Sequence, residues 1–561
     1  MVRHLRLALV LALGTSLFPA EGFGRSYKVK YLENTNGRIV LSQGWVAARA
    51  PKSGWLETRY PQTVQEHTAL DTNTVVELVA ADSEILQREL VNRNVSPKAF
   101  DPMDFIEADE EVVTLVDSGP SENRIDLVFM GDGYTAAERD KFFEDARRLT
   151  DDMFKGDTFR SYLPVFNVHA VFKPSNVSGI GAGSEPKDTA YGLYREGNTL
   201  RAIFATNTSA ARRSCAQAPD CDYPILMAND PYYGGLGGEF AITTSSPTSG
   251  TKVLRHELGH NFGKVGEEYD GGGYFGANTS SSVGSLKWSH WTEGSVAAEP
   301  AIARHIEWPW HHLSEGPYSA SFRSNGAYRY FEVQYSASGV ETDDTLDFRL
   351  DGERLPAPSP GHSDREFVEY FHDGGLTSGS HKITVEEKVH DGNNWLSDLT
   401  VYEYGDEYHF DPEHVGAYPL FSEWGSIAGY RPTHETCLMR NMKSVRFCPI
   451  CQENNWLQFF RKVSLIDGVE IIPAGANYEA HLRVPSLGQF RSEVVNADER
   501  LDVRWYRNGE LVGSLEGQLV GQIPAVQASD NWEVEVQFHT PEVRKDSSGL
   551  LVARKRIRVT N

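Results

Sequence analysis

The stretch VLRHELGHNFGKVGEEYD, residues Val253–Asp270, decides how this chain is interpreted. His256 and His260 are four residues apart, and residues four apart on a helix lie about 40° apart around its axis. Both imidazoles therefore project from one face of a helix and can bind one metal ion. Glu257 falls at the edge of that face, where its carboxylate can reach a metal-bound water without being a ligand. This HExxH arrangement is typical of metal-assisted hydrolysis.

The residues around the two histidines strengthen this interpretation. Gly259 allows another backbone to come close to the helix, and Gly263 is expected to end it. Glu267 and Glu268 supply carboxylates just beyond. The pattern favours a catalytic helix over a surface helix with solvated histidines.

The length, composition and net charge of the chain exclude several classes of protein. A chain of 561 residues is too long for one core and should divide into about three to five domains. With 40% hydrophobic and 24% charged residues, it is globular rather than disordered. A net charge of -24 argues against a nucleic-acid partner, because phosphates would be repelled.

The first twenty residues predict a secretory signal peptide. Arg3 and Arg6 precede a short apolar run, Leu7–Leu13, and a small residue stands at Ala20. A membrane helix needs about twenty apolar residues, and no stretch of the chain is that long. We therefore expect a secreted, extracellular or periplasmic protein with no membrane span.

Five cysteines fit an oxidising compartment. Cys215 and Cys221 lie in one tight loop and are expected to form a disulfide, and a second bridge is expected within the group Cys437, Cys448 and Cys451. The CPIC pair, Cys448 and Cys451, could instead be a redox motif or half of a zinc site. The fifth thiol is left over.

Changes in pattern along the chain predict an α+β multidomain protein. RIDLVFM, a capped helical segment and FNVHAVFK form a strand–helix–strand unit, which opens an α/β domain. Short strands with Gly/Asp turns predict β-sandwiches elsewhere, the last with an immunoglobulin-like Trp-Tyr-x-Asn-Gly segment. The predicted regions are a signal peptide (1–20), an N-terminal β-domain (21–118), the α/β domain in two parts (119–315 and 405–463), an inserted β-sandwich (316–404) and a C-terminal β-sandwich (464–561).

Several motifs in the same order resemble a known family. HELGHNFG followed by EEY, with LVFMGDGYTAAE upstream and YRPTHETCLMRNM…FCPIC downstream, resembles the bacterial IgA metalloendopeptidase family of the metzincin clan. The resemblance covers about residues 124–290 and 418–460. It implies a metzincin-like α/β zinc peptidase domain with two histidine ligands and a glutamate base. It also implies a methionine turn beneath the metal, for which Met439 is the better candidate and Met442 the other.

The third metal ligand departs from the metzincin pattern. Standard metzincins place it six residues after the second histidine, where this chain has Gly266. The turn looks one residue longer here, so we assign the third ligand to Glu267, with Glu268 as its rival. If Glu267 ligates, Glu268 would support a histidine or a backbone amide. Tyr430, ahead of the methionine turn, is a candidate oxyanion donor or a packing residue.

These observations predict a secreted endopeptidase with a Zn²⁺ cofactor. Protein or glycoprotein substrates would be hydrolysed through a metal-activated water, with Glu257 as general base and then acid. A bridge from Cys437 to Cys448 or Cys451 would fasten the methionine turn, worth about 3 kcal/mol in the chain-entropy model. The alternative is a non-catalytic surface or glycan-binding protein with a structural zinc site, whose β-sandwich modules contact glycans.

Overall fold

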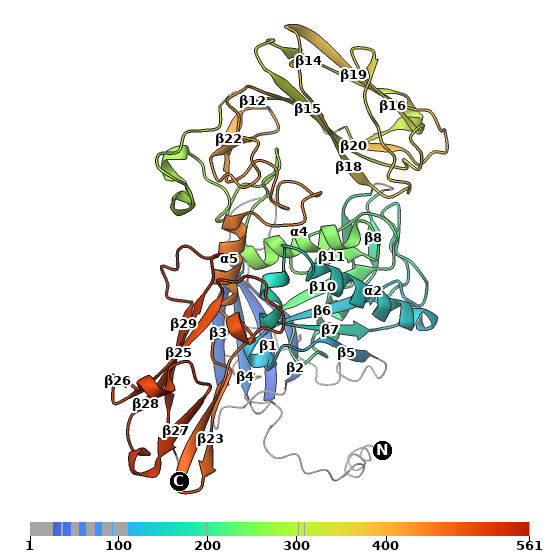
Figure 1. The fold of residues 1–561 in the computed structure, drawn as a ribbon. Coiled ribbons are helices and arrows are strands. Elements are labelled where there is room, and N and C mark those ends of the chain that lie inside the picture. The colour runs from blue at the N-terminus through green and yellow to red at the C-terminus, as the bar shows by residue number, and fades with distance from the viewer. Residues whose placement is uncertain are drawn as a thin grey trace, which may run out of the picture.

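The computed structural model describes residues 26–34, 37–46, 55–62, 73–80, 93, 110–197, 200–300, 302–307 and 309–559. The predicted signal peptide, residues 1–20, lies outside these residues. The described part combines a few helices with several separate β-sheets (Figure 1). This confirms the prediction of a mixed, multidomain fold at that level.

Four antiparallel strands form the first sheet, in the order β2-β1-β4-β3. They arise from the alternating apolar and polar runs near the N-terminus, which are typical of strands. Their bounds are β1 (Ser26–Asn34), β2 (Gly37–Val46), β3 (Trp55–Gln62) and β4 (Asn73–Ala80).

The second sheet carries the candidate site and has the order β11-β10-β6-β7-β5. Strands β11, β10, β6 and β7 run parallel, and β5 joins the edge antiparallel to β7. All residues of β6 and β7 are buried, as expected for strands covered on both faces. The bounds are β5 (Glu111–Val116), β6 (Ile125–Asp132), β7 (Phe166–Phe172), β10 (Tyr223–Ala228) and β11 (Ala241–Thr244), with a separate pair β8 (Leu193–Arg195) and β9 (Ile203–Ala205).

Strand β5 departs from the predicted division of the chain. We placed residues up to 118 in the N-terminal β-domain, yet β5 is hydrogen-bonded to β7. Its alternating pattern belongs to an edge strand with one solvated face, which sequence alone cannot distinguish from a strand of the preceding domain.

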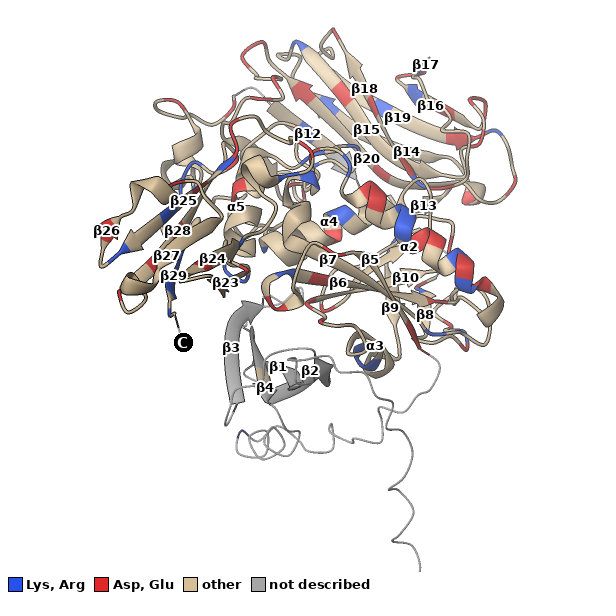
Figure 2. Cartoon of the chain, turned by 60° about the horizontal axis from the view of Figure 1, so that its bottom comes forward, with Lys and Arg blue, Asp and Glu red and all other residues tan. Residues whose placement is uncertain are grey.

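Within the described part of the chain, four helices accompany this sheet. The predicted capping box is present, with Thr135 and Glu138 bonded reciprocally at the start of a short 3-10 turn that leads into α2. Helix α4 lies between the parallel sheet and the inserted sandwich in both ribbon views (Figures 1 and 2). The bounds are α2 (Arg139–Met153), α3 (Thr208–Cys215), α4 (Gly250–Gly263) and α5 (Pro449–Phe459).

The inserted sandwich begins earlier than residue 316. Strands β12 and β13 precede that residue and pair with β20, which makes them part of the insert. One sheet has the order β12-β20-β15-β18 and the other β14-β19-β16-β17. The bounds are β12 (Ile302–Glu307), β13 (His311–His312), β14 (Tyr318–Ser324), β15 (Tyr330–Ser338), β16 (Leu346–Leu350), β17 (Glu353–Arg354), β18 (Glu366–His372), β19 (Gly379–Glu387) and β20 (Trp395–Tyr404).

The chain then returns to the α/β domain through the hairpin β21 (Tyr418–Phe421) and β22 (Ile427–Arg431), followed by α5. A C-terminal sandwich completes the fold, with sheets ordered β23-β24-β27 and β26-β25-β28-β29. Its strands are β23 (Gly468–Ala474), β24 (Asn477–Arg483), β25 (Arg500–Arg507), β26 (Glu510–Leu511), β27 (Val520–Pro524), β28 (Trp532–His539) and β29 (Val552–Ile557).

One hydrophobic core joins the α/β domain to the C-terminal sandwich. It runs from Leu127 in β6 through Trp456 in α5 to Trp505 in β25, all completely buried. A buried ion pair between Arg124 and Asp467 crosses the same boundary at 2.6 Å. These two parts therefore pack as one body.

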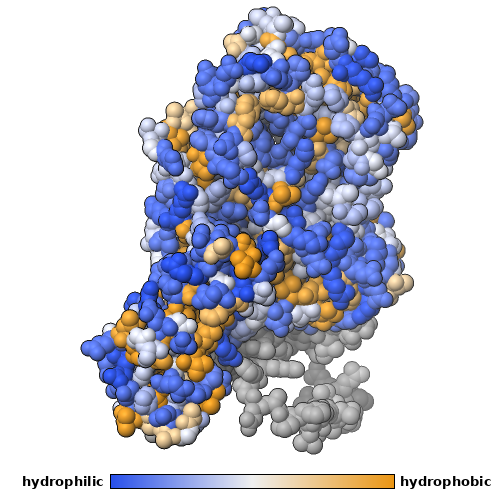
Figure 3. All heavy atoms as spheres, viewed as in Figure 1, coloured by the Kyte–Doolittle hydropathy of each residue, from blue (hydrophilic) through white to orange (hydrophobic). Residues whose placement is uncertain are grey.

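The surface is largely polar. Figure 3 shows a face on which hydrophilic residues predominate and hydrophobic ones are scattered. Acidic and basic residues alternate along α2 (Figure 2). Within the described residues, no helix has both the length and the hydrophobicity needed to cross a bilayer.

Candidate metal centre and active site

Helix α4 presents the two predicted histidine ligands side by side. His256 and His260 are buried, and their Nε2 atoms lie 3.2 Å apart. The Nδ1 atom of each ring faces a backbone carbonyl, that of Leu438 at 3.2 Å from His256 and that of Val265 at 2.8 Å from His260. A proton on each Nδ1 would be donated to these carbonyls, which leaves both Nε2 lone pairs free for a metal.

Glu267 completes a three-residue cluster with the histidines. Its Oε1 lies 3.0 Å from His260 Nε2, and its Oε2 lies 3.2 Å from His256 Nε2. One ligand atom from each residue falls within 4.8 Å of the others, and all three residues are buried. Two imidazoles and a carboxylate are a zinc donor set that leaves a fourth position open, so these residues fit the predicted cofactor.

The electrostatics of the cluster favour positive charge at its centre. Burial would lower the pKa of His256 and His260, but the Glu267 carboxylate raises both, that of His260 to about 9. Burial would raise the pKa of Glu267, but the two imidazoles hold it well below its ordinary range. Donors that stabilise a proton between them in this way also suit a divalent cation.

Glu257 stands beside this cluster rather than in it. It follows His256 on α4, and it is not among the three residues whose ligand atoms converge. Burial raises the pKa of Glu257, while the two imidazoles act in the opposite direction. A carboxylate with a raised pKa can both accept and return a proton nearer to neutral pH.

Met439 packs directly beneath α4. It is completely buried, and a Cβ added at Gly259 would lie 2.8 Å from its Sδ atom and 3.1 Å from the Phe447 ring. Gly259 is therefore the position at which the helix allows the Met439 segment to approach. The carbonyl facing His256 belongs to Leu438, the residue before Met439, so this segment also orients a histidine. Met442, the other candidate, is only partly buried at the edge of the core.

Gly266 lies where the backbone leaves no room for a side chain. A Cβ at this position would lie 2.5 Å from the Gly273 carbonyl oxygen and 2.6 Å from the Phe275 amide nitrogen. The backbone is held there by a hydrogen bond from the Gly266 N–H to the Phe275 carbonyl at 3.0 Å. No side chain fits at residue 266, and the first carboxylate that reaches the histidines is that of Glu267.

Glu268 is in a different environment from Glu267. Its side chain is completely buried beside Cys448 and Cys451, whose Sγ atoms lie 3.9 and 3.7 Å from Glu268 Oε1. Asn278 donates a hydrogen bond to the same oxygen at 2.8 Å. The structure thus separates the two adjacent glutamates that the sequence left as rivals.

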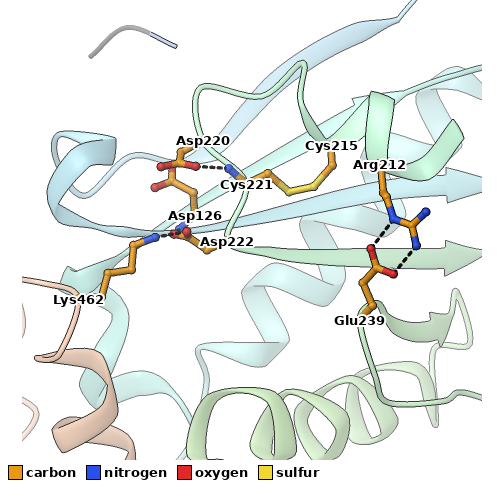
Figure 4. Close-up of a disulfide and its surroundings, with 8 residues drawn as sticks. All are labelled: Asp126, Arg212, Cys215, Asp220, Cys221, Asp222, Glu239 and Lys462. Carbon is orange, nitrogen blue, oxygen red and sulfur yellow. Dashed lines mark hydrogen bonds and ion pairs between the residues drawn. A yellow bond between two sulfur atoms is a disulfide. The ribbon is translucent and has the colours of Figure 1, made fainter. Parts of the chain in front are cut away.

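The cysteine predictions are half right. Cys215 and Cys221 form the expected disulfide, close to Asp220 and Asp222 (Figure 4). The predicted second bridge is wrong, because Cys437, Cys448 and Cys451 are all free thiols. The first pair lies within one short loop, where sequence separation decides the partner. The late thiols instead surround a carboxylate, which no sequence spacing indicates.

Tyr430 does not join the cluster in any described contact. It lies in β22, its backbone is paired with that of Ser280, and its side chain packs partly buried against the core. Two other tyrosines come closer. The Tyr269 ring stacks on His256, with centroids 6.4 Å apart. The charges of Glu257 and Glu267 act on both Tyr269 and Tyr233.

The sequence analysis missed Tyr269 and Tyr233 as candidate functional residues. Burial raises the pKa of both hydroxyls, and the neighbouring carboxylates add to the effect, so both remain O–H donors at neutral pH. The only sequence indication was the position of Tyr269 directly after the glutamate pair. Nothing in the sequence pointed to Tyr233, which precedes α4 by a whole strand.

The insert contacts the start of α4. Asp364, which precedes β18, accepts hydrogen bonds from the hydroxyls of Ser246, Thr248 and Ser249 at 2.7, 2.7 and 2.6 Å. Lys252 of α4 forms an ion pair with Glu366 at 3.1 Å. A negative charge near a helix N-terminus is favourable, so this contact attaches the insert to the start of α4.

Comparison with known proteins supports the family resemblance. Residues 113–292 match the model of the family described as IgA Peptidase M64, a segment that contains α4, Glu267 and Glu268. The predicted resemblance to this peptidase family is confirmed over these residues. No curated protein matches the chain significantly.

Two solved structures show only weak likeness. The adhesin domain of Epf from Streptococcus pyogenes is 9% identical, with 46% of this chain and 74% of the other covered and a TM-score of 0.11. A cycloisomaltooligosaccharide glucanotransferase from a Paenibacillus species is 11% identical, with 60% and 51% covered and a TM-score of 0.12. At these TM-scores, neither likeness says anything about the present chain.

Proposed function

We propose that this protein is a secreted, zinc-dependent endopeptidase with a metzincin-like catalytic domain. The observation that carries the proposal is the convergence of His256, His260 and Glu267 beside Glu257 on α4. The family match supports a peptidase and, with it, a protein substrate. The predicted N-terminal signal and the Cys215–Cys221 disulfide support secretion.

In this proposal, His256, His260 and Glu267 hold the zinc ion. Zinc bound there supplies Lewis-acid chemistry, polarising a peptide carbonyl and making water more acidic. Glu257 accepts the proton that the attacking water loses and donates it to the departing amine. Its pKa, raised by burial, suits both halves of that exchange. Tyr269, whose ring stacks on His256 and whose hydroxyl interacts with Glu267, replaces Tyr430 as our candidate donor to the developing oxyanion.

The number of converging donors favours catalysis over the alternative of a structural zinc site in a binding protein. A structural zinc is closed by four protein ligands, whereas a catalytic one keeps a position for water. At the histidines, three described residues converge. We found no described feature that supports the predicted glycan contact of the β-sandwich modules.

The proposal is tested by hydrolysis of casein, gelatin and a peptide library. The purified wild-type protein should cleave these substrates, and a chelator should abolish cleavage until zinc is returned. Glu257→Gln should retain zinc and fold but lose at least about 100-fold in activity, because only the proton acceptor is removed. The matched control is Glu144→Gln, an exposed glutamate on α2, which should be fully active. Wild-type protein that hydrolyses nothing in the library, or a fully active Glu257→Gln, would refute the proposal.

The third ligand is tested by zinc content. Glu267→Ala and His256→Ala should each lose the same zinc ion, so the double variant should lose no more than either single variant. A Glu267→Ala protein that retains full zinc would overturn the assignment of this residue.

A further inference from the structure

A second group of potential metal ligands lies behind the histidine cluster. Glu268, Cys437, Cys448 and Cys451 place one donor atom each within 4.8 Å of the others. All four side chains are at most 1% exposed. Among the residues that the structure describes, this is the only such group with three thiols.

Three distances within this group are close to the edges of a tetrahedron around one metal ion. A zinc–sulfur bond of about 2.3 Å places two sulfurs of a tetrahedral site about 3.8 Å apart, and a sulfur and a carboxylate oxygen about 3.5 Å apart. The Cys437 and Cys451 Sγ atoms are 3.8 Å apart. Glu268 Oε1 lies 3.7 Å from Cys451 Sγ and 3.9 Å from Cys448 Sγ.

The buried carboxylate of Glu268 needs a compensating positive charge or a proton. Its Oε1 accepts a hydrogen bond from Asn278, but its Oε2 is buried without any hydrogen-bond partner. A buried carboxylate with an unsatisfied oxygen is costly unless a cation or proton compensates it. A disulfide between two of the cysteines would leave both this oxygen and the third thiol unsatisfied. A metal ion would take one donor atom from each of the four residues and place its positive charge beside the whole carboxylate.

We propose that Glu268, Cys437, Cys448 and Cys451 bind a second zinc ion, which is structural. Soft thiolate donors select zinc, copper(I) or iron–sulfur clusters, and one hard carboxylate in a compact four-ligand set favours zinc among these. Four protein ligands close the coordination sphere, so this ion has no position for a reacting water. It differs in this respect from the three-ligand histidine site.

The proposed ion would fasten three segments under α4. Cys437 comes two residues before Met439, Cys448 is the N-cap of α5 and Cys451 lies in its first turn. Glu268 is adjacent to Glu267, the carboxylate of the histidine cluster. The ion would therefore hold the methionine segment and the Glu267 loop against α5 without contacting the substrate.

The first test needs no variant and counts thiols and metal. Protein purified without reductant from an oxidising compartment should contain a second zinc equivalent. After denaturation with a chelator, it should expose three thiols, because the remaining two of the five cysteines form the disulfide. A single exposed thiol would reveal a late disulfide and overturn the proposal. Replacement of zinc by cobalt should produce a thiolate-to-metal absorption band, and its absence would also overturn it.

Variants separate this site from the proposed catalytic site. His256→Ala should abolish hydrolysis and lose one zinc equivalent while keeping the cobalt–thiolate band. Cys451→Ser should lose the other equivalent and the band, and the paired Cys215→Ser/Cys221→Ser variant is the control that should keep both. Should the protein prove inactive on every substrate, the band would still decide this proposal. Should Cys451→Ser fail to fold, the thiol count and the wild-type cobalt spectrum decide it alone.

Discussion

Replacing Gly259 by alanine tests whether α4 and Met439 are in close contact. Alanine is the better helix former by about 1 kcal/mol, so an unobstructed helix would be stabilised. In this structure the new Cβ would lie 2.8 Å from Met439 Sδ and 3.1 Å from Phe447. Both neighbours are at most 1% exposed and cannot move into solvent. Overpacking of this kind costs about 1–3 kcal/mol, which exceeds the gain in helix propensity in most of that range.

We therefore expect Gly259→Ala to lower the free energy of unfolding by about 1 kcal/mol. Activity should fall as well, because displacement of Met439 moves the Leu438 carbonyl that faces His256. Urea denaturation followed by tryptophan fluorescence is a suitable assay, since Trp288 and Trp456 belong to the same core. Gly284→Ala is the matched control, because nothing lies within 4 Å of a Cβ added there.

A double-mutant cycle with Met439→Ala shows whether the contact with Met439 causes the loss of stability in Gly259→Ala. Without the methionine side chain, the Gly259 substitution meets no sulfur and should become neutral or stabilising by up to about 1 kcal/mol. The coupling energy between the two substitutions should thus be about 1–2 kcal/mol. If the two changes in unfolding free energy instead add to within about 0.5 kcal/mol, the contact with Met439 is not the cause of the instability of Gly259→Ala, and the reasoning fails.

Three further predictions follow from buried charges. Burial, with the Glu435 carboxylate, raises the pKa of Glu332 to about 7, so the folded protein keeps a proton that the unfolded chain releases above about pH 4.5. Stability therefore falls as pH rises through that window. At pH 8, Glu332→Gln should raise the free energy of unfolding by up to about 3 kcal/mol, seen as a higher melting temperature, whereas at pH 4 it should have no such effect. Arg124→Ala leaves Asp467 buried without its cation and should cost about 3–5 kcal/mol in urea denaturation, with partial recovery when Asp467→Ala is added. Asp364→Ala removes the acceptor of three hydroxyls and should weaken hydrogen-exchange protection at the start of α4 by about 1–3 kcal/mol. Unchanged protection would show that the contact with the insert does not stabilise this end of the helix.

Sequence reasoning succeeded where the determining interactions are local. The spacing of His256 and His260 fixes their common face, and the bounds of α4 end at Gly263 as expected. Thr135 and Glu138 form their capping box because both partners lie within one turn. Helix periodicity and capping involve residues a few positions apart, so one sequence contains all the information that they need.

It failed where partners come from distant segments. The sequence did not indicate that β5 pairs with β7, because the paired residues, from Val116 with Val168 to Glu111 with Phe172, lie 52 to 61 positions apart. The late cysteines were paired as a disulfide because spacing says nothing of Glu268, which reaches them from another loop. Tyr233 was missed for the same reason. Tertiary proximity of this kind leaves no period or spacing in the sequence.

The pair Glu267–Glu268 combines both situations. After α4 ends, the chain has no regular structure from residue 264 to 268. Glu267 faces His256 and His260, and Glu268 faces the thiols. Neighbouring side chains of a non-helical segment can point to opposite sides, and both residues carry the same carboxylate. The sequence alone therefore could not show which of the two faces the histidines. One peptide unit thus connects the two clusters. The backbone hydrogen bond from the Glu268 N–H to the Met439 carbonyl at 2.9 Å holds this segment in place. We therefore expect a substitution at either glutamate to affect only the cluster that its side chain faces.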